Sequence, residues 1–159
     1  MNQKTRYVLA VLRISLGWVF FWSFLDKLLG LGISTAPENA WLAGGSPTYG
    51  FLTFATAGPL AGLYQSIAGL PVVNVLFMFG LLGLGLALIL GIGLKIAGVG
   101  GPLMMLMMWS AHLPPAQNPL IDQHIIYALL FVLLAQTEAG MTWGLGNWWR
   151  ERVGIAILE

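Results

Sequence analysis

Two ionisable residues fall inside long apolar stretches of the chain, where a charge needs an explanation. Arg13 lies in the first of these stretches and Glu138 near the end of the last one. A charge inside the hydrocarbon core of a membrane is costly and marks a functional or structural site. Both residues are expected near the same membrane face, and each would otherwise be unpaired. The sequence therefore predicts a structural ion pair between Arg13 and Glu138.

A second group of polar residues is expected at the opposite face. Lys27 ends the first apolar stretch, His112 ends the third, and His124 opens the fourth. Histidine exchanges protons near neutral pH, and a lysine ammonium donates hydrogen bonds. These residue types suit a carbonyl-bearing amphiphile such as a membrane quinone as cofactor. We predict Lys27 and His124 as the catalytic residues that would polarise or protonate its head group.

The apolar part of such a ligand needs a slot between helices. On the first helix, aromatic residues share a stripe with Lys27, and on the fourth they follow His124 at spacings of three or four residues. The residues predicted to bind the cofactor are Phe20, Phe24, Trp109, His112, Tyr127 and Phe131.

The residues around His124 also allow simpler interpretations. Asp122 precedes the fourth apolar stretch and is favoured as the N-cap of its helix. A zinc site formed by His112, Asp122 and His124 is conceivable, but Asp-x-His is not a recurring ligand spacing, so we predict no metal site. Met104, Met105, Met107 and Met108 point around the whole circumference of a helix, which indicates flexible packing rather than copper binding.

The composition shows which kind of protein must position these residues. Of 159 residues, 58% are apolar and only 8% are charged, and the mean hydropathy is +0.83. A soluble domain is about 45–50% apolar and about 25% charged. The composition therefore disfavours a water-soluble enzyme, a disordered chain and a nucleic-acid binder, and a lipid bilayer is the expected surrounding. Without cysteine, the chain has no disulfide, thiolate metal site or iron–sulfur cluster.

Four stretches are long and apolar enough to be membrane-spanning helices, at about 7–29, 72–94, 96–112 and 123–142. We expect an all-α membrane protein in which residues 1–159 form one domain, a four-transmembrane-helix bundle. Lys and Arg residues are concentrated before the first span, between the second and third, and after the fourth. With four spans these places share one side of the membrane, so both termini are predicted to be cytoplasmic in the cell membrane.

Residues 31–70 are too long for a turn and too rich in Gly and Pro to span. We expect a capping segment on the outer face, lying at the membrane interface or covering a ligand pocket. Within the second span, Gly83, Ala87 and Gly91 repeat every fourth residue, with Gly85 and Gly93 as a second row. Small residues at this spacing let helices pack closely in lipid.

Three segments resemble those of the DoxX-like membrane proteins. They are RISLGWVFFWSFLDKLLG at 13–30, NPLIDQHIIYAL at 118–129 after Pro114-Pro115, and GMTWGLGNWW at 140–149. The resemblance implies a small four-helix inner-membrane protein. Relatives include the DoxD-type subunit of thiosulfate:quinone oxidoreductase, which passes electrons from thiosulfate to membrane quinone.

This resemblance favours a quinone-linked redox subunit or a small membrane oxidoreductase component. The alternative is a non-catalytic membrane scaffold that assembles with other oxidoreductase subunits. Besides the lipid bilayer, the expected partners are further copies of the chain or partner oxidoreductase subunits, and no nucleic acid.

Overall fold

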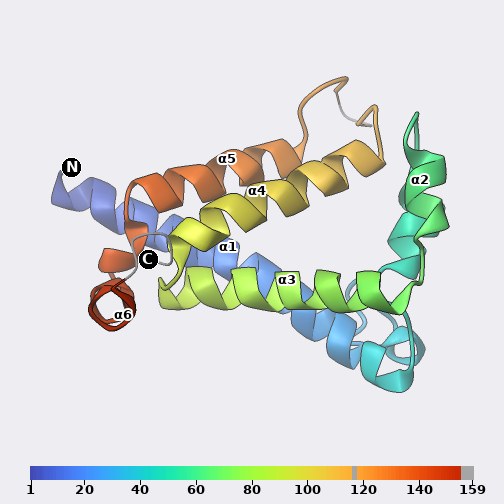
Figure 1. Ribbon diagram of the computed structural model, residues 1–159, viewed down its shortest axis with the longest axis horizontal. Helices are drawn as coiled ribbons and strands as arrows, with labels where there is room; N and C mark the ends of the chain where they lie inside the picture. Colours follow the sequence, from blue (N-terminus) through green and yellow to red (C-terminus); the bar gives the residue numbers. More distant parts are fainter. Residues whose placement is uncertain (116–117, 155–159) are drawn as a thin grey trace.

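The computed structural model describes residues 1–115 and 118–154, and their regular secondary structure is helical (Figure 1). The α-helices are α1 (Gln3–Leu29), α2 (Ala61–Ser66), α3 (Pro71–Leu90), α4 (Leu94–Ala111), α5 (Gln123–Gln136) and α6 (Gly146–Val153). Shorter helical turns lie at Pro37–Asn39, Trp41–Ala43, Phe51–Ala55 and Ala139–Met141. One isolated bridge joins Ala57 to His112, and the described ranges contain no strand. The predicted all-α class is confirmed.

Within the described ranges, α1, α3 and α4 are long and apolar enough to cross a membrane. They occupy the first three predicted spans and support a multi-pass membrane protein. The fourth predicted span, 123–142, is a shorter helix. Helix α5 has 14 residues, because Glu138 takes up a left-handed conformation with φ of 48° soon after it ends. Fourteen residues rise about 21 Å, less than the roughly 30 Å of a hydrocarbon core.

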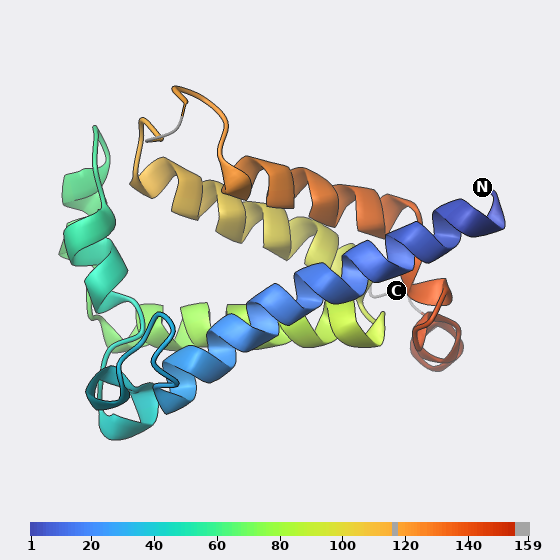
Figure 2. The same ribbon diagram turned by 180° about the vertical axis from the view of Figure 1, so that it is seen from behind.

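The four longest helices pack in two pairs, α1 against α3 and α4 against α5, and α3 joins the pairs through α4. The N-terminus of α1, the turn between α3 and α4, and α6 lie at one end (Figures 1 and 2). We call this the basic end, since it carries Lys4, Arg6, Lys95, Arg150 and Arg152. The segment 31–70, including α2, crosses the opposite end, which we call the capped end.

Glycines bring the paired helices into close contact, although not all of those expected. A Cβ on Gly85 would lie 2.8 Å from the backbone nitrogen of Phe21, and one on Gly101 would lie 2.5 Å from the ring of Phe131. Gly83, in the row predicted to pack, has no neighbour within 4 Å. The close approach of α1 to α3 therefore uses Gly85, from the second row, because the rotation of α3 turns Gly83 outward.

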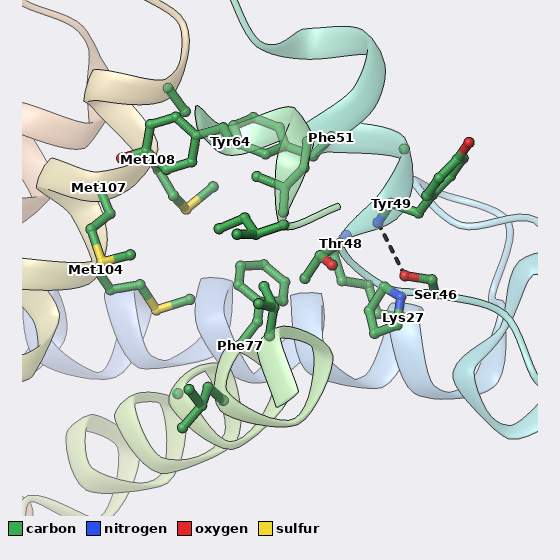
Figure 3. Close-up of a pocket in the computed structure, with 18 of the residues that line it drawn as sticks. Lys27, Ser46, Thr48, Tyr49, Phe51, Tyr64, Phe77, Met104, Met107 and Met108 are labelled. Atoms are coloured by element: carbon green, nitrogen blue, oxygen red, sulfur yellow. Dashed lines mark hydrogen bonds between the residues drawn. The ribbon is translucent and has the colours of Figure 1, made fainter. Parts of the chain in front are cut away.

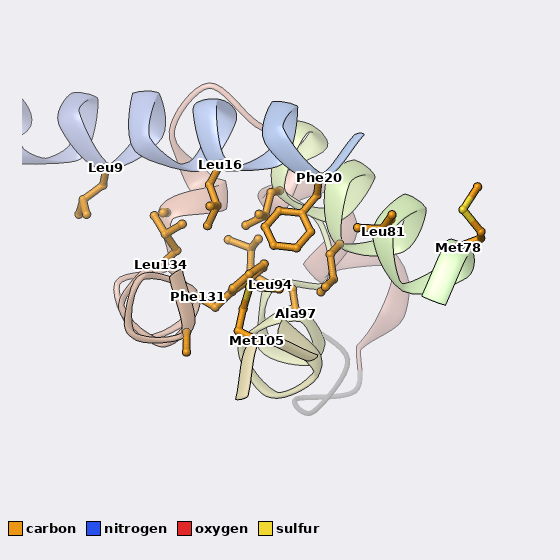
Figure 4. Close-up of a cluster of buried hydrophobic side chains, with 14 residues drawn as sticks. Leu9, Leu16, Phe20, Met78, Leu81, Leu94, Ala97, Met105, Phe131 and Leu134 are labelled. Carbon is orange, nitrogen blue, oxygen red and sulfur yellow. The ribbon is translucent and has the colours of Figure 1, made fainter. Parts of the chain in front are cut away.

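The apolar core lies between α1, α3, α4 and α5 (Figure 4). Phe20 and Phe131 are 4% and 1% exposed, and their rings meet edge to face with centroids 5.2 Å apart. Met105 is buried in the same core, whereas Met107 is half exposed. The methionines thus point in different directions around α4, as their consecutive positions predict.

Candidate functional site

A cavity of about 980 Å³ lies at the capped end, between α3, α4 and the segment 31–70 (Figure 3). Its size is at the upper end of the range for small-molecule pockets, roughly 300–1,000 Å³. The wall is mainly apolar. It includes Val73, Leu76, Phe77 and Gly80 from α3, Leu103, Met104, Met107 and Met108 from α4, and Phe51, Leu52, Phe54 and Tyr64 from the capping segment.

Most polar lining residues lie at one side of the cavity. Lys27, Ser46, Thr48 and Tyr49 lie together there, away from the methionines of α4 (Figure 3). The Tyr64 hydroxyl, by contrast, lies at the α4 side and pairs with the Ser110 hydroxyl at 2.7 Å. The Lys27 ammonium is half-buried, and its Nζ lies 3.5 Å from the Ser34 hydroxyl. The cavity therefore has a hydrogen-bonding end and a long apolar end, the division expected of a site for an amphiphile.

Asp26 fastens the capping segment to α1 beside this polar end. Its carboxylate is 1% exposed and accepts hydrogen bonds from the backbone N–H groups of Ile33 and Ser34, at 3.2 and 3.1 Å. The Ser34 hydroxyl donates a third bond, at 2.6 Å. A buried carboxylate requires such donors. Asp26 therefore holds the start of the segment in place, while Lys27, the next residue, faces the cavity.

Asn74 plays the corresponding part on α3. Its side-chain oxygen accepts hydrogen bonds from Ser46, at 2.9 Å, and from Thr48, at 2.6 Å. Both donors belong to the capping segment and line the cavity. One amide thus holds two polar lining residues in position, since each has a defined hydrogen-bond partner.

The structure separates the residues predicted to form a quinone slot. Lys27 lines the cavity, but Phe20 and Phe131 fill the core, with Phe24 and Tyr127 packed against it. Trp109 donates its indole N–H to the carbonyl of Leu120, at 2.9 Å. The cavity therefore lies between α3 and α4, and not between α1 and α5 where the slot was predicted. Helical spacing gives the faces of each helix but not which helices are neighbours.

His112 and His124 lie together in a second polar site, beside the cavity. Asp122 Oδ2 is 3.2 Å from His112 Nε2 and 2.7 Å from His124 Nδ1. The rings of His112 and Phe51 meet edge to face with centroids 6.1 Å apart, and Phe51 lines the cavity. This cluster of His112, Asp122 and His124 therefore stands behind the cavity wall, and we call it the histidine cluster.

Asp122 is also the N-cap of α5, as its position predicts. Its Oδ1 accepts hydrogen bonds from the backbone N–H groups of His124, at 2.9 Å, and Ile125, at 3.4 Å. Burial alone would raise the pKa of Asp122, but hydrogen bonds from the His124 ring and from the backbone N–H groups of His124 and Ile125 outweigh burial and lower that pKa. Asp122 is therefore a carboxylate at neutral pH.

Arg13 and Glu138 do not pair with each other in the structure. The buried Arg13 guanidinium donates from Nη1 to the carbonyls of Leu88 and Ile89, and from Nη2 to those of Thr142 and Trp143. The first two belong to the last turn of α3, whose carbonyls lack partners within the helix. These carbonyls also form the negative end of the helix dipole. Backbone oxygens thus stabilise Arg13. Its guanidinium caps the C-terminal end of α3 instead of pairing with Glu138.

Glu138 instead contacts a residue of α6. Its Oε1 lies 2.8 Å from Arg150 Nη2, and the two side chains are 55% and 41% exposed. Because α5 ends before Glu138, this carboxylate is at the surface of the basic end rather than on the face of α5 that meets α1. Because α5 ends at Gln136, Glu138 does not take the position on the helix from which it was predicted to pair with Arg13.

Several lining residues were not predicted as site residues. Met104, Met107 and Met108 stand at positions i, i+3 and i+4, so they share one face of α4, and that face lines the cavity. This i, i+3, i+4 spacing was the feature of the sequence that could have predicted the methionine face of the cavity. The contributions of Phe77 and Tyr64 depend on how the capping segment folds over α3, which no local pattern indicates.

Comparisons with known proteins were made for the whole chain. No family model, no curated protein and no solved structure matches the chain. The resemblance to DoxX-like proteins therefore rests on the three sequence segments given above.

Proposed function

We propose that this chain is a multi-pass protein of the cell membrane that binds a quinone-like amphiphile in the capped-end cavity and takes part in quinone-linked redox chemistry. The observation that carries the proposal is the division of the cavity into a hydrogen-bonding end with Lys27 and a long apolar end lined by α3 and α4. The resemblance to DoxX-like proteins points to the same class of ligand.

The lining residues fit the chemistry of a membrane quinone. A quinone head group carries carbonyl oxygens, which need donors, and Lys27 offers an ammonium. Its isoprenoid tail needs apolar surface, which Phe77 and the methionine face of α4 supply. When bound, a quinone supplies a two-electron acceptor. Lys27 would hold and polarise one head-group oxygen, and the apolar wall would exclude water from it.

We further propose that α5 completes a four-helix arrangement with both termini in the cytoplasm. Helix α5 packs along α4, and the turn at Ala139–Met141 extends it toward the basic end. Of the seven Lys and Arg residues, Lys4, Arg6, Lys95, Arg150 and Arg152 lie at that end, whereas Lys27 lies at the capped end. The positive-inside rule places such an end in the cytoplasm, so the capped end and its cavity would face outward.

The chain needs a partner for electron transfer, because it has no cysteine with which to carry electrons itself. A partner oxidoreductase subunit would supply them. The alternative function is a membrane scaffold that assembles such subunits without chemistry of its own. The two functions differ in whether the cavity must bind a quinone.

Extraction of the purified protein tests the proposal first. The full chain is purified in mild detergent, and its bound lipids are extracted and identified by mass spectrometry. We expect quinone to be enriched over its proportion in the membrane. Phospholipid alone, without quinone, would contradict the proposal and favour the scaffold.

A matched pair of glycines then tests the location of the site. Gly100 lines the cavity and Gly83 does not, and an added Cβ has no neighbour within 4 Å at either position. Gly100→Leu should therefore fill part of the cavity and weaken binding of a water-soluble quinone analogue, measured by quenching of tryptophan fluorescence. Gly83→Leu should bind like the unaltered chain. Equal binding by the two variants would place the ligand elsewhere.

Lys27 is tested in the same assay. Lys27→Met removes the ammonium but keeps most of the apolar stem, and it should weaken binding about tenfold to a hundredfold, as for the loss of one hydrogen bond from a charged donor. Lys95→Met, at the basic end, is the control. Unchanged affinity in Lys27→Met would remove Lys27 from the proposed site.

A further inference from the structure

We propose that His112, Asp122 and His124 form a three-ligand site for a divalent transition-metal ion, with zinc as the preferred ion. Each residue offers one ligand atom, and the three atoms lie within 4.8 Å of one another. Two imidazoles and a carboxylate are a donor set that zinc uses in proteins. This site is distinct from the cavity and does not depend on the proposed function.

The hydrogen bonds of His112 indicate that a proton or a metal cation lies between its ring and Asp122. His112 Nδ1 lies 2.8 Å from the carbonyl oxygen of Met108, which can only accept, so Nδ1 carries a proton and donates. A neutral ring then presents a lone pair from Nε2 to Asp122 Oδ2, 3.2 Å away. Two lone pairs at this distance repel each other. A cation placed between Nε2 and the carboxylate resolves the conflict.

The same hydrogen bond prepares His112 as a metal ligand. A histidine that binds a metal nearly always donates its other ring N–H to a carbonyl or carboxylate, which fixes the tautomer and the ring orientation. The hydrogen bond from His112 Nδ1 to the Met108 carbonyl, within α4, fixes the ring and leaves Nε2 as the ligand atom. The N-cap bonds of Asp122 Oδ1 likewise fix the carboxylate and leave Oδ2 turned toward both imidazoles.

The distances and exposure also suit a metal ion. Ligand atoms of a tetrahedral zinc with bonds of about 2.0–2.1 Å lie roughly 3.3 Å apart. The carboxylate oxygen is 3.2 Å from one imidazole nitrogen and 2.7 Å from the other, close to this spacing. The two imidazole nitrogens lie within 4.8 Å of each other, so binding an ion would also draw the two rings together. The His112 side chain is 25% exposed, which gives an ion a route of entry. Three protein ligands leave a fourth position for water or another small donor.

The composition of the chain makes the test specific. The sequence has two histidines and no cysteine, and both histidines belong to the cluster. The full chain is purified with a tag that contains no histidine and is stripped with a chelator. Zinc binding is then measured by calorimetry, and cobalt is added as a spectroscopic probe. We expect one ion per chain, visible cobalt absorption of a low-coordinate nitrogen–oxygen site, and a rise in Tm with zinc.

Matched variants separate a metal site from a hydrogen-bonded cluster. Asp122→Asn keeps a good N-cap residue but removes the anionic ligand, and His112→Gln removes one imidazole. Each should weaken zinc binding at least about a hundredfold, because loss of an outer-shell partner alone costs 10- to 100-fold. Glu38→Gln, at an exposed acid of the capping segment, should bind zinc normally. Absence of cobalt absorption in the unaltered chain, or unchanged zinc affinity in the His112→Gln, His124→Gln double variant, would overturn the proposal and leave a proton as the charge of the cluster.

Discussion

The basic end and the capped end differ in the groups that surround a buried or half-buried cation. At the basic end, Arg13 is enclosed by backbone, and an added Cβ on Gly91 would lie 2.7 Å from its Nη1. At the capped end, Lys27 borders a cavity of about 980 Å³, and its Nζ has a hydroxyl 3.5 Å away. Both cations lie on α1. The contacts of Arg13 therefore favour a structural role, whereas Lys27 lines the cavity in which we propose a ligand.

This difference follows from the groups that surround each charge. A guanidinium can bind several carbonyls at once because its donors are arranged in a planar fork. The end of α3 and the turn at 142–143 supply those carbonyls, so backbone oxygens accept the hydrogen bonds of Arg13. An ammonium is a compact charge on a flexible stem, so Lys27 can turn toward a ligand. The role of a buried cation in a membrane protein is thus indicated by the groups that contact it rather than by its depth.

The largest effect is expected at Arg13. Arg13→Met leaves four carbonyl oxygens without donors, two of them at the end of α3. The free energy of unfolding should fall by at least about 3 kcal/mol, since each hydrogen bond to a charged group contributes about 1.5–3 kcal/mol. Thermal unfolding in detergent measures this, with Lys27→Met as the control at the capped end. Equal Tm values for the two variants would remove the distinction between the ends.

The second prediction concerns the tightness of the basic end. Gly91 has a φ of 73° and no room for a side chain, whereas Gly93 has a φ of 58° and nothing within 4 Å. Gly91→Ala should lower the free energy of unfolding by about 2–3 kcal/mol, from backbone strain together with overpacking. Gly93→Ala carries the strain alone and should cost about 1–2 kcal/mol. If the two variants were equally stable, the enclosure of Arg13 would be looser than its contacts indicate.

The third prediction concerns Asp26, which fastens the capping segment. Asp26→Asn removes the charge that attracts the N–H groups of Ile33 and Ser34 and leaves one oxygen in place of two. Stability should fall by about 1–3 kcal/mol. Hydrogen exchange of the backbone amides of residues 33 and 34 should become faster in the variant, whereas exchange of the amides in α3 should stay the same. Glu38→Gln, at an exposed site in the same segment, should leave exchange unchanged. Unaltered protection in Asp26→Asn would mean that the segment is held by other contacts.

Much of the fold could be predicted from composition and periodicity. The predicted spans 7–29, 72–94 and 96–112 overlap α1, α3 and α4, although the second runs four residues past the end of α3. Pro71 and Gly91 stand at the start and after the end of α3. The end of α5 could not be predicted in this way, because Ala139, Gly140 and Met141 continue the apolar pattern while the backbone turns away. Hydropathy measures how a segment partitions into lipid and does not report where its helix stops.

The candidate site was predicted only in part, for a related reason. Lys27 was identified because a charge at the end of a span is conspicuous in the sequence. The cavity wall was missed because it is formed where the capping segment covers α3 and α4, with Asn74 holding Ser46 and Thr48. These contacts join residues 26 or more positions apart. Local spacing contains no information about them.

Glu138 gives the smallest expected effect and the sharpest contrast with Arg13. An ion pair with Arg13 would make Glu138→Gln strongly destabilising, since it would leave a buried cation unpaired. The observed partner is Arg150, and both side chains of that pair are about half exposed. Exposed pairs contribute about 0–1 kcal/mol, so Glu138→Gln should change the free energy of unfolding by less than about 0.5 kcal/mol. Thermal unfolding at low and at high salt measures this. A fall as large as that of Arg13→Met would mean that the two residues act together after all.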